Sequence, residues 1–298
     1  MSRMTSAPRE LLGPHRLVLD VRDRPGPAPL RFERADGGRL LLRQEERPLL
    51  LGRPVGGPCC PDLYVHRLDG HRSPLPPLSA AMLRSSVNWP HQYARWLDEA
   101  DGTPLHDGRW ELSLRTTFQP GIWTEDFLRE WPGGRLELYC GGGWHGVVPL
   151  RPLSPPDAGR VKAYRKHVRE GTLAPVLVWW VPFLDGWLIL DGHDRAVAAL
   201  AEGRTPQCVV LTRVCDEELW RRDAEAVTEG HRHHMERLTA RPATPATSRQ
   251  RAAMEQNYGD VMAGLSYDPS DIRSWPLPGG APAWDALAGA AMFQFPSD

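Results

Sequence analysis

Residues 175–181 of this chain read PVLVWWV, an unbroken apolar run. A strand of this composition has no side suited to water, so it belongs in the interior of a sheet that is covered on both faces. The rest of the chain must therefore supply neighbouring strands on either side and packing layers above and below. Its 298 residues are enough to bury a core of that kind.

The surrounding segment, 146–214, has the patterns of the strands and helices that such a sheet needs. Val161, Tyr164 and Val168 recur at helical spacing before a glycine, and Asp185-Gly186 predicts a turn that makes the central strand half of a hairpin. Alternating elements of this kind define an α/β module. In order, we predict strand 147–153, helix 157–171, strand 175–181, strand 187–190, helix 194–202 and strand 207–211.

The preceding region is predicted to be rich in β-strands and in tryptophan, and its tryptophans are interpreted mainly as core residues. Proline and glycine total 30 and 28 in the chain, and their frequent interruptions keep regular elements short. Helical turns are expected at 91–100 and 124–131. Short apolar runs between the interruptions predict strands around 17–19, 40–42 and 49–51.

The part of the chain after the module is predicted to be helical and then irregular. Its first stretch has helical composition with an expected break at Gly230, and a second helix is expected at 249–265. Residues 239–250 (TARPATPATSRQ) read as a flexible linker between the two. The complete expectation is an α+β protein with a β-rich region at 1–145, the module at 146–214, a helical extension at 215–265 and a Pro/Gly-rich tail at 266–298.

Composition and charge argue against several classes of protein. The sequence has no apolar window of about 18 residues and no signal peptide at its start, so we expect a cytoplasmic protein with no membrane partner. The cysteines are scattered without C-x-x-C spacing, which argues against a disulfide framework or a zinc ribbon. With a net charge of −1, the chain lacks the basic excess of a nucleic-acid-binding protein. Arginine supplies all but two of the 36 basic residues, a bias typical of a GC-rich bacterial genome.

The sequence DGHDR at 191–195 joins an apolar strand to a helix, and it is the place where pattern and chemistry converge. A helix N-terminus presents unpaired backbone N–H groups and the positive end of the helix dipole, which together favour a bound anion. Gly192 permits close approach of a ligand, and Arg195 can donate two hydrogen bonds to a phosphate. The turn is therefore a candidate phosphate site.

Several residues of this turn have more than one interpretation. Asp191 is a metal ligand, a base that accepts a proton from a reacting hydroxyl, or simply the N-cap of the helix. The structural alternative for His193 is a turn residue that is hydrogen-bonded to the backbone. For Arg195 it is a surface arginine paired with Glu202 or Asp194.

Three stretches of the module occur in an order that resembles the ParB N-terminal/sulfiredoxin-like superfamily. They are VPLRP at 148–152, VREG and PVLV within 168–178, and LDGHDRA at 190–196, and the resemblance covers about 70 residues. It implies that Gly192 and Arg195 belong to a turn that binds nucleotide phosphates. Asp191 and His193 match the Asp-Gly-His-His-Arg form of the motif, which is similar to that of kinases acting on free serine.

The chain also departs from this superfamily. His193 stands where sulfiredoxins carry a reactive cysteine, which argues against cysteine-sulfinic reduction, and Asp194 stands where partition proteins carry an arginine. After the module, residues 216–238 contain seven acidic residues against four arginines, where partition proteins have a helix-turn-helix. Sequence-specific DNA binding is therefore not expected.

The turn and the resemblance together predict binding of a nucleotide (ATP, ADP or CTP) or another phosphorylated small molecule. The predicted binding residues are Gly192, His193, Asp194 and Arg195, and Asp191 is the candidate catalytic base of a phosphotransferase or nucleotide hydrolase. Mg²⁺ would accompany the nucleotide, and no resident metal site is predicted. The alternative is a non-catalytic interaction or regulatory protein that uses the module as a scaffold and binds a protein partner through its Trp-rich flanks.

Three other features have a functional and a structural interpretation. His231 and His234 share a helix face and could ligate a metal, although a solvated helix end is favoured because no partner motif accompanies them. The basic side of helix 157–171 could line the phosphate site or face solvent. Residues 69–72, DGHR, repeat the turn motif in part, and we interpret the repeat as coincidence because the prolines that follow exclude a helix.

Overall fold

The computed structural model describes most of the chain, which divides into two compact units. The first comprises Met1–Arg213 and Ile272–Asp298, and the second Val214–Asp271. The predicted helical turns at 124–131 lie outside the described residues. The described residues are 9–13, 15–24, 26–55, 62–83, 85–118, 121–123, 133–137, 146–184, 186–214, 217–240, 242, 244–264 and 274–292.

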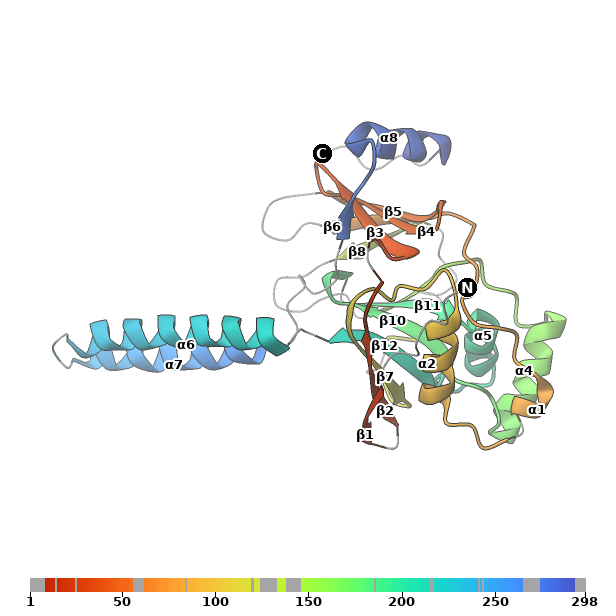
Figure 1. Ribbon diagram of the computed structural model, residues 1–298, viewed down its shortest axis with the longest axis horizontal. Helices are drawn as coiled ribbons and strands as arrows, with labels where there is room; N and C mark the ends of the chain where they lie inside the picture. The colour runs from red at the N-terminus through yellow and green to blue at the C-terminus, as the bar shows by residue number, and fades with distance from the viewer. Residues whose placement is uncertain are drawn as a thin grey trace. The chain divides into compact units, whose positions relative to one another are not determined.

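The first unit contains the predicted central strand, β10 (Val176–Val181), in a seven-stranded sheet (Figure 1). This strand pairs antiparallel with β11 (Gly186–Asp191) and parallel with β12 (Cys208–Val214), so the expected hairpin and the shared sheet are confirmed. On the other side of β11 lies β9 (Gly146–Pro149), in parallel. Beyond β12 the sheet is completed from the N-terminal region by β7 (Gly108–Arg115), β2 (Arg16–Val21) and β1 (Arg9–Gly13).

Two helices of the module cover one face of this sheet. They are α4 (Gly159–Glu170) and α5 (His193–Ala201), and both are confirmed at about their predicted positions. Val161 and Val168 of α4 pack against valine and alanine side chains of α5, while Ala196 of α5 lies against the sheet. The apolar side chains of each helix are therefore packed in the interior, as their spacing in the sequence predicts.

A second, six-stranded sheet packs on the other face and makes the large core that they share. The rings of Phe32 and Trp179, one from each sheet, lie 5.5 Å apart, and α2 (Trp89–Glu99) adds the buried Tyr93. The central strand is thus covered on both faces, as its composition requires. The second sheet has the order β13 (Ser274–Pro276), β3 (Leu30–Ala35), β4 (Arg39–Gln44), β5 (Arg47–Val55), β6 (Asp62–Arg67) and β8 (Gly133–Glu137), and a short helix, α1 (Ala80–Leu83), follows β6 along the chain.

The C-terminal tail is ordered where the sequence predicted only an irregular segment. Its strand β13 pairs with β3, and α8 (Gly280–Ala290) packs on the outer face of the second sheet. Trp284 is 1% exposed there and donates a hydrogen bond from its indole nitrogen to the carbonyl of Leu40 at 2.8 Å. A buried tryptophan with a satisfied N–H anchors the helix, which glycine and proline content alone did not reveal.

The second unit is a pair of helices, α6 (Glu217–Thr239) and α7 (Pro245–Gly264). The expected break at Gly230 is wrong, because one glycine inside a helix costs about 1 kcal/mol without ending it. The expected linker is also shorter than predicted, since Pro245 occupies the first turn of α7, where a proline is tolerated. None of the described helices is both long and apolar enough to span a bilayer.

Candidate functional site

The turn at 191–195 begins where the sheet ends. Asp191 is the last residue of β11 and pairs with Leu177, and Gly192 follows as the N-cap of α5 with φ of 94°. That left-handed conformation favours glycine, and a glycine N-cap supplies no side-chain acceptor to the first helical amides. The interpretation of Asp191 as the N-cap is therefore wrong, and its carboxylate serves other partners.

Arg195 is buried, with 3% of its surface exposed, and its guanidinium turns back under the strand end. Its Nη2 donates to Asp191 Oδ2 at 2.7 Å, to the carbonyl of Pro175 at 2.9 Å and to Tyr93 Oη at 3.3 Å. Burial acts to lower the pKa of Arg195, but attraction to Tyr93 and Asp191 outweighs it and raises the pKa. The interpretation as a surface arginine is wrong, and this guanidinium holds Asp191 in place.

Close packing against Arg195 is a second reason why position 192 requires a glycine. A Cβ atom built on Gly192 would lie 2.7 Å from Arg195 Nη2 and 2.9 Å from its Cζ. The guanidinium therefore lies flat against the Cα of the glycine. The open space that the sequence assigned to a ligand is filled at this point by a side chain of the protein.

Asp191 has one partner on each carboxylate oxygen. Oδ2 accepts the hydrogen bond from Arg195, and Oδ1 accepts one from Ser73 Oγ at 2.6 Å. Its side chain keeps 18% of its surface exposed. Of the interpretations that the sequence left open, the geometry favours a carboxylate presented to a hydroxyl.

Asp194 organises two further arginines in front of the turn. Its carboxylate is 5% exposed, accepts a hydrogen bond from Ser154 Oγ at 2.9 Å, and pairs with Arg151 at 3.2 Å and Arg160 at 3.4 Å. The side chains of Arg151 and Arg160 remain 37% and 67% exposed. Asp194, which stands where partition proteins carry an arginine, thus brings two other arginines to the turn.

Two buried histidines form hydrogen bonds with the backbone near the turn. The N–H of Leu150 donates to His193 Nε2 at 3.1 Å, directly after β9, which ends at Pro149 rather than near 153. His71 Nε2 donates to the carbonyl of Leu190 at 2.9 Å, and the two imidazole rings lie 5.8 Å apart. Burial lowers the pKa of His71 to about 4 and that of His193 well below its usual value, so both rings are neutral. His193 therefore matches its structural interpretation, a turn residue that is hydrogen-bonded to the backbone.

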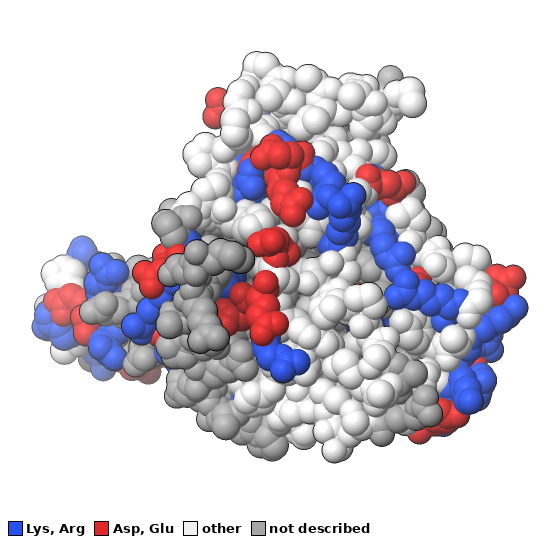
Figure 2. All heavy atoms as spheres, turned by 45° about the vertical axis from the view of Figure 1, so that its right-hand side comes forward, with Lys and Arg blue, Asp and Glu red and all other residues white. Residues whose placement is uncertain are grey.

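These groups surround a small polar cavity of about 210 Å³. The five residues of the turn line it together with His71, Ser73, Arg151, Arg160 and Tyr164. Its charged lining comprises three arginines and two aspartates, and the amides at the start of α5 add positive potential. Figure 2 shows basic side chains gathered on the side of the molecule where α4 lies.

The exposed side of α4 carries five basic residues, of which one lines this cavity. They are Arg160, Lys162, Arg165, Lys166 and Arg169. Arg160 lines the cavity, whereas Arg165 and Arg169 both pair with Glu202, at 2.6 Å and 2.8 Å. Lys166 lies 3.8 Å from Glu170 on the same helix. Arg160 therefore fits the interpretation that this face lines the phosphate site, whereas Arg165, Lys166 and Arg169 do not.

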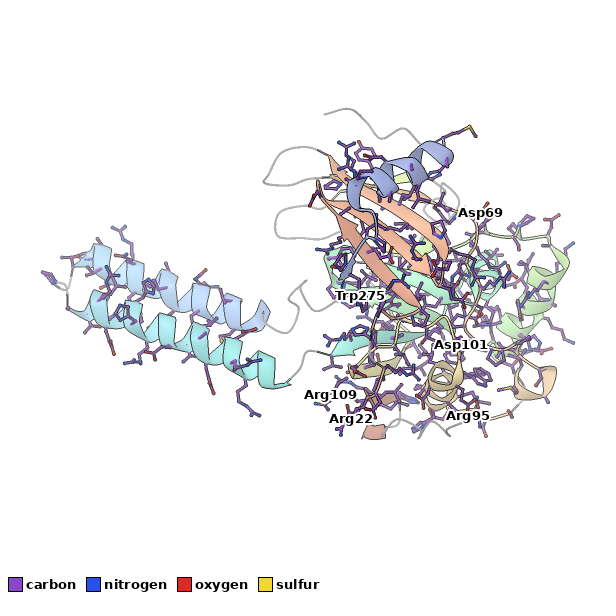
Figure 3. All side chains as sticks on the ribbon, turned by 45° about the horizontal axis from the view of Figure 1, so that its top comes forward. Arg22, Asp69, Arg95, Asp101, Arg109 and Trp275 are labelled. Atoms are coloured by element: carbon purple, nitrogen blue, oxygen red, sulfur yellow. The ribbon has the colours of Figure 1, made fainter. Side chains whose placement is uncertain are left out.

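Sequence reasoning missed His71, Ser73, Arg151 and Tyr93 as members of the site. The first two belong to the loop after β6 that begins with the DGHR repeat, whose Asp69 is labelled in Figure 3. The repeat lies at the site, and its similarity to DGHDR at 191–195 was the one signal that the sequence offered. Because it does not open a helix, local pattern gave no reason to place it there.

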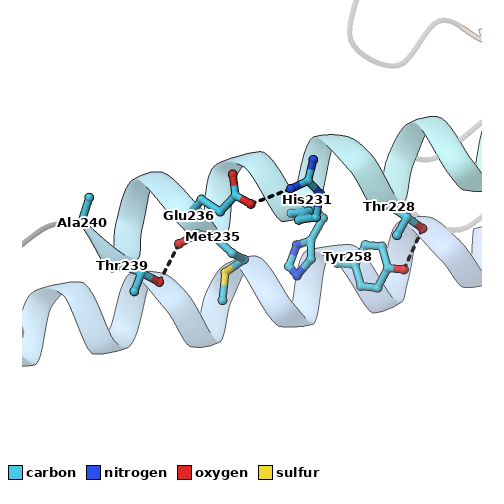
Figure 4. Close-up of a pocket in the computed structure, with 8 residues that line it drawn as sticks. Thr228, His231, Met235, Glu236, Thr239, Ala240 and Tyr258 are labelled. Atoms are coloured by element: carbon cyan, nitrogen blue, oxygen red, sulfur yellow. Dashed lines mark hydrogen bonds and ion pairs between the residues drawn. The ribbon is translucent and has the colours of Figure 1, made fainter.

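A larger groove of about 650 Å³ runs along α6 and α7 (Figure 4). His231 stacks on Tyr258 at 4.3 Å, and His234 Nδ1 lies 2.8 Å from the carbonyl of Gly230. Across the described parts of the chain, no group of three or more His, Cys, Asp and Glu side chains converges as metal ligands would. At the turn, charged side chains of both signs line a cavity together with a helix N-terminus, so we take the turn as the candidate site.

No protein-family model, curated protein or solved structure matched this chain. The resemblance to the ParB N-terminal/sulfiredoxin-like superfamily stays a prediction.

Proposed function

We propose that this protein binds a nucleotide or another phosphorylated small molecule at the 191–195 turn and acts on its phosphoryl group, as a ParB N-terminal/sulfiredoxin-like phosphotransferase or nucleotide hydrolase. The observation that carries the proposal is that two solvent-accessible arginines, Arg151 and Arg160, line the same cavity as the N-terminus of α5. Guanidinium groups and helix amides are the two donor types that proteins use most readily for phosphate.

The size of the cavity supports a phosphate and limits what else enters. Pockets for drug-sized ligands measure about 300–1,000 Å³, whereas this cavity has about 210 Å³. A phosphate or pyrophosphate group suits it, with any nucleoside lying outside. Arg151 and Arg160 are free to turn from Asp194 toward such an anion because both remain partly exposed.

The chemistry assigned to Asp191 is that of a general base. Its carboxylate is held by Arg195 and accepts a hydrogen bond from a hydroxyl, which is the geometry a base needs toward an attacking oxygen. Arg195 is accordingly a positioning residue rather than a phosphate ligand. Both carboxylates of the turn are engaged in ion pairs, so Mg²⁺ would enter with the phosphates of a nucleotide rather than occupy a prepared protein site.

The alternative, an interaction protein that docks partners through its Trp-rich flanks, has less support. Trp96 and Trp110 are buried, and Trp89 and Trp123 are half-buried. Among the described residues, the large hydrophobic side chains that are exposed are Val261 and Met292. The described tryptophans of the flanks therefore serve the core.

A thermal-shift titration with pyrophosphate, ATP, ADP and CTP, with and without Mg²⁺, tests the proposal. A ligand of the native state raises the melting temperature by mass action, and we expect this for at least one of these compounds. Arg151→Ala should weaken the binding by about ten- to a hundredfold, the loss of one charge-assisted hydrogen bond. Lys166→Ala, an exposed α4 cation outside the cavity, is the matched control and should bind as wild type. No shift with any phosphate compound would contradict the proposal and favour the interaction protein.

A further inference from the structure

Ser73 and Asp191 have the geometry of a nucleophile and its base. The hydroxyl Oγ of Ser73 lies 2.6 Å from Asp191 Oδ1, and Arg195 orients the other carboxylate oxygen at 2.7 Å. A hydroxyl within hydrogen-bond reach of a base that is itself oriented by a third group is the signature of an activated nucleophile. The chain therefore supplies a hydroxyl at the point where a phosphoryl acceptor would lie.

The position of Ser73 is fixed by its surroundings on the loop after β6. Its Oγ accepts a hydrogen bond from the N–H of Leu75 at 3.1 Å. Two acceptors lie near the hydroxyl hydrogen, Asp191 Oδ1 at 2.6 Å and the carbonyl of Leu75 at 3.4 Å, and the shorter bond is the one to Asp191. Gln44 binds the backbone of Arg72 through both ends of its amide, at 2.8 Å and 2.9 Å. Together with the bond from His71 to Leu190, these contacts hold the loop against the end of β11.

The surroundings of Ser73 suit phosphoryl transfer as well as its position does. Ser73 is exposed and lines the cavity that also presents Arg151 and Arg160. A phosphoryl group in that cavity would have guanidinium donors around its oxygens and the serine hydroxyl beside it. Positioning and charge stabilisation of this kind are the main protein contributions to phosphoryl transfer.

A second serine of the site provides an internal comparison. Ser154 Oγ also donates to a carboxylate, that of Asp194, at 2.9 Å. That carboxylate is 5% exposed and shared with two arginines, and Ser154 is not among the residues that line the cavity. Asp194 lines the cavity as well, so of the two serines with an aspartate partner, Ser73 is the one whose own side chain lines the space for a phosphate.

We propose that Ser73 is a phosphoryl acceptor, so that the protein phosphorylates itself from a nucleoside triphosphate bound at the turn. The inference rests on the proposed function of that turn. Ser73 Oγ attacks the γ-phosphorus, a new O–P bond forms, and the bond from the γ-phosphorus to the bridging oxygen breaks. The nucleoside diphosphate leaves with that electron pair, and the hydroxyl proton passes to Asp191.

The product has a defined place in the site. A phosphoserine at 73 carries a charge between about −1.5 and −2 near neutral pH and three strong acceptor oxygens. It would face Arg151 and Arg160 in a cavity of about 210 Å³, which has room for little more than that group. The phosphorylated chain should therefore bind added pyrophosphate more weakly than the unmodified chain.

The experiment is to incubate the full-length protein with ATP or CTP and Mg²⁺ and to measure its intact mass, followed by peptide mapping. We expect one added phosphoryl group on Ser73. The phosphoryl group should be absent from Ser73→Ala, present in Ser248→Ala, which replaces an exposed serine of α7 outside the site, and retained at a reduced rate in Ser73→Thr, which keeps a hydroxyl. Asp191→Asn should not become phosphorylated on Ser73, even where circular dichroism shows the variant folded, because an amide is not a base at neutral pH.

Binding of pyrophosphate, followed by thermal shift in wild type and Ser73→Ala, separates this inference from the function on which it rests. Binding by both proteins with no phosphate on Ser73 would overturn the acceptor role and leave the phosphate site standing. Phosphate on Ser154 or elsewhere but not on Ser73 would overturn it equally. Absence of binding in both proteins would remove the proposed function, and the acceptor role with it.

Discussion

Gly192 is the residue on which the shape of the candidate site most directly depends. Its φ of 94° allows the chain to pass from β11 into α5, and its lack of a side chain leaves room for the guanidinium of Arg195. Arg195 in turn holds Asp191. One glycine thus connects the backbone turn to the orientation of the proposed base.

Replacement of Gly192 by alanine should therefore cost more than replacement of an ordinary left-handed glycine. The variant pays for the positive φ, about 1–2 kcal/mol, and for a Cβ placed 2.7 Å from Arg195 Nη2. Gly171 is the matched control, because its φ is 69° and a Cβ there meets nothing within 4 Å. Urea unfolding of both variants measures the difference, and equal losses of stability would contradict the contact with Arg195.

The buried histidines give the protein a pH dependence with a definite sign. The pKa of His71 is about 4 in the folded chain against 6.5 when unfolded, and that of His193 is also lowered. The unfolded state therefore takes up protons first as the pH falls. The stability from these neutral rings is complete above pH 6.5 and declines from there toward pH 4, by on the order of 2–3 kcal/mol for His71.

Chemical denaturation at a series of pH values from 7.5 to about 4 tests this expectation. Wild type should lose stability steadily over that interval. His71→Gln, which can still donate a hydrogen bond to Leu190 but does not titrate, should lose less. The same pH dependence in both proteins would show that His71 is not the neutral buried group described here.

At the scale of elements, the module is held together by its central strand. β10 has neighbours on both sides and buried side chains on both faces, whereas α6 and α7 bury little of their surface against each other. Among the described residues of the helical unit, Ala224 and Leu238 are the hydrophobic ones that are buried. Burial on this small scale gives a helix pair little protection against opening.

Hydrogen exchange should reproduce that difference. We expect the amides of β10 and β11 to be among the slowest in the chain, and those of α6 and α7 to exchange faster, because local opening exposes less apolar surface in the helix pair. Exchange followed by mass spectrometry on peptides from 176–191 and 217–264 measures it. Faster exchange in the strands than in the helices would contradict the assignment of the core.

At the scale of the whole molecule, the chain is built from two units, one of which buries far more apolar side chains than the other. The first holds both sheets and the candidate site, and the second is the helix pair. Small units that bury little apolar surface are marginally stable. The two units are therefore expected to unfold separately.

Thermal denaturation followed by two signals makes that expectation measurable. Of the 12 tryptophans, all but Trp220 lie in the first unit, so fluorescence reports mainly on that unit, while ellipticity at about 222 nm reports on both. We expect a lower transition that appears in ellipticity alone and a higher one that appears in both signals. A single coincident transition would show that the two units unfold together.

Within the module, the order of strands and helices, the hairpin and the turn at 191–195 could all be predicted from local sequence patterns. These features depend on apolar spacing and on glycine at turns, which act over a few residues. The same local reasoning failed where proline and glycine dominate, as at α8, whose formation depends on burying Trp284 against another sheet.

The roles of the turn residues, by contrast, depend on contacts that the fold makes between distant segments. Ser73 reaches Asp191 across 118 positions of sequence, and Arg195 is buried because Tyr93 and Pro175 supply acceptors from other elements. A polar side chain becomes buried, and its pKa shifts, only when distant partners replace the water it loses. No local pattern contains those partners, so the sequence indicated where the site lies while the fold determined its chemistry.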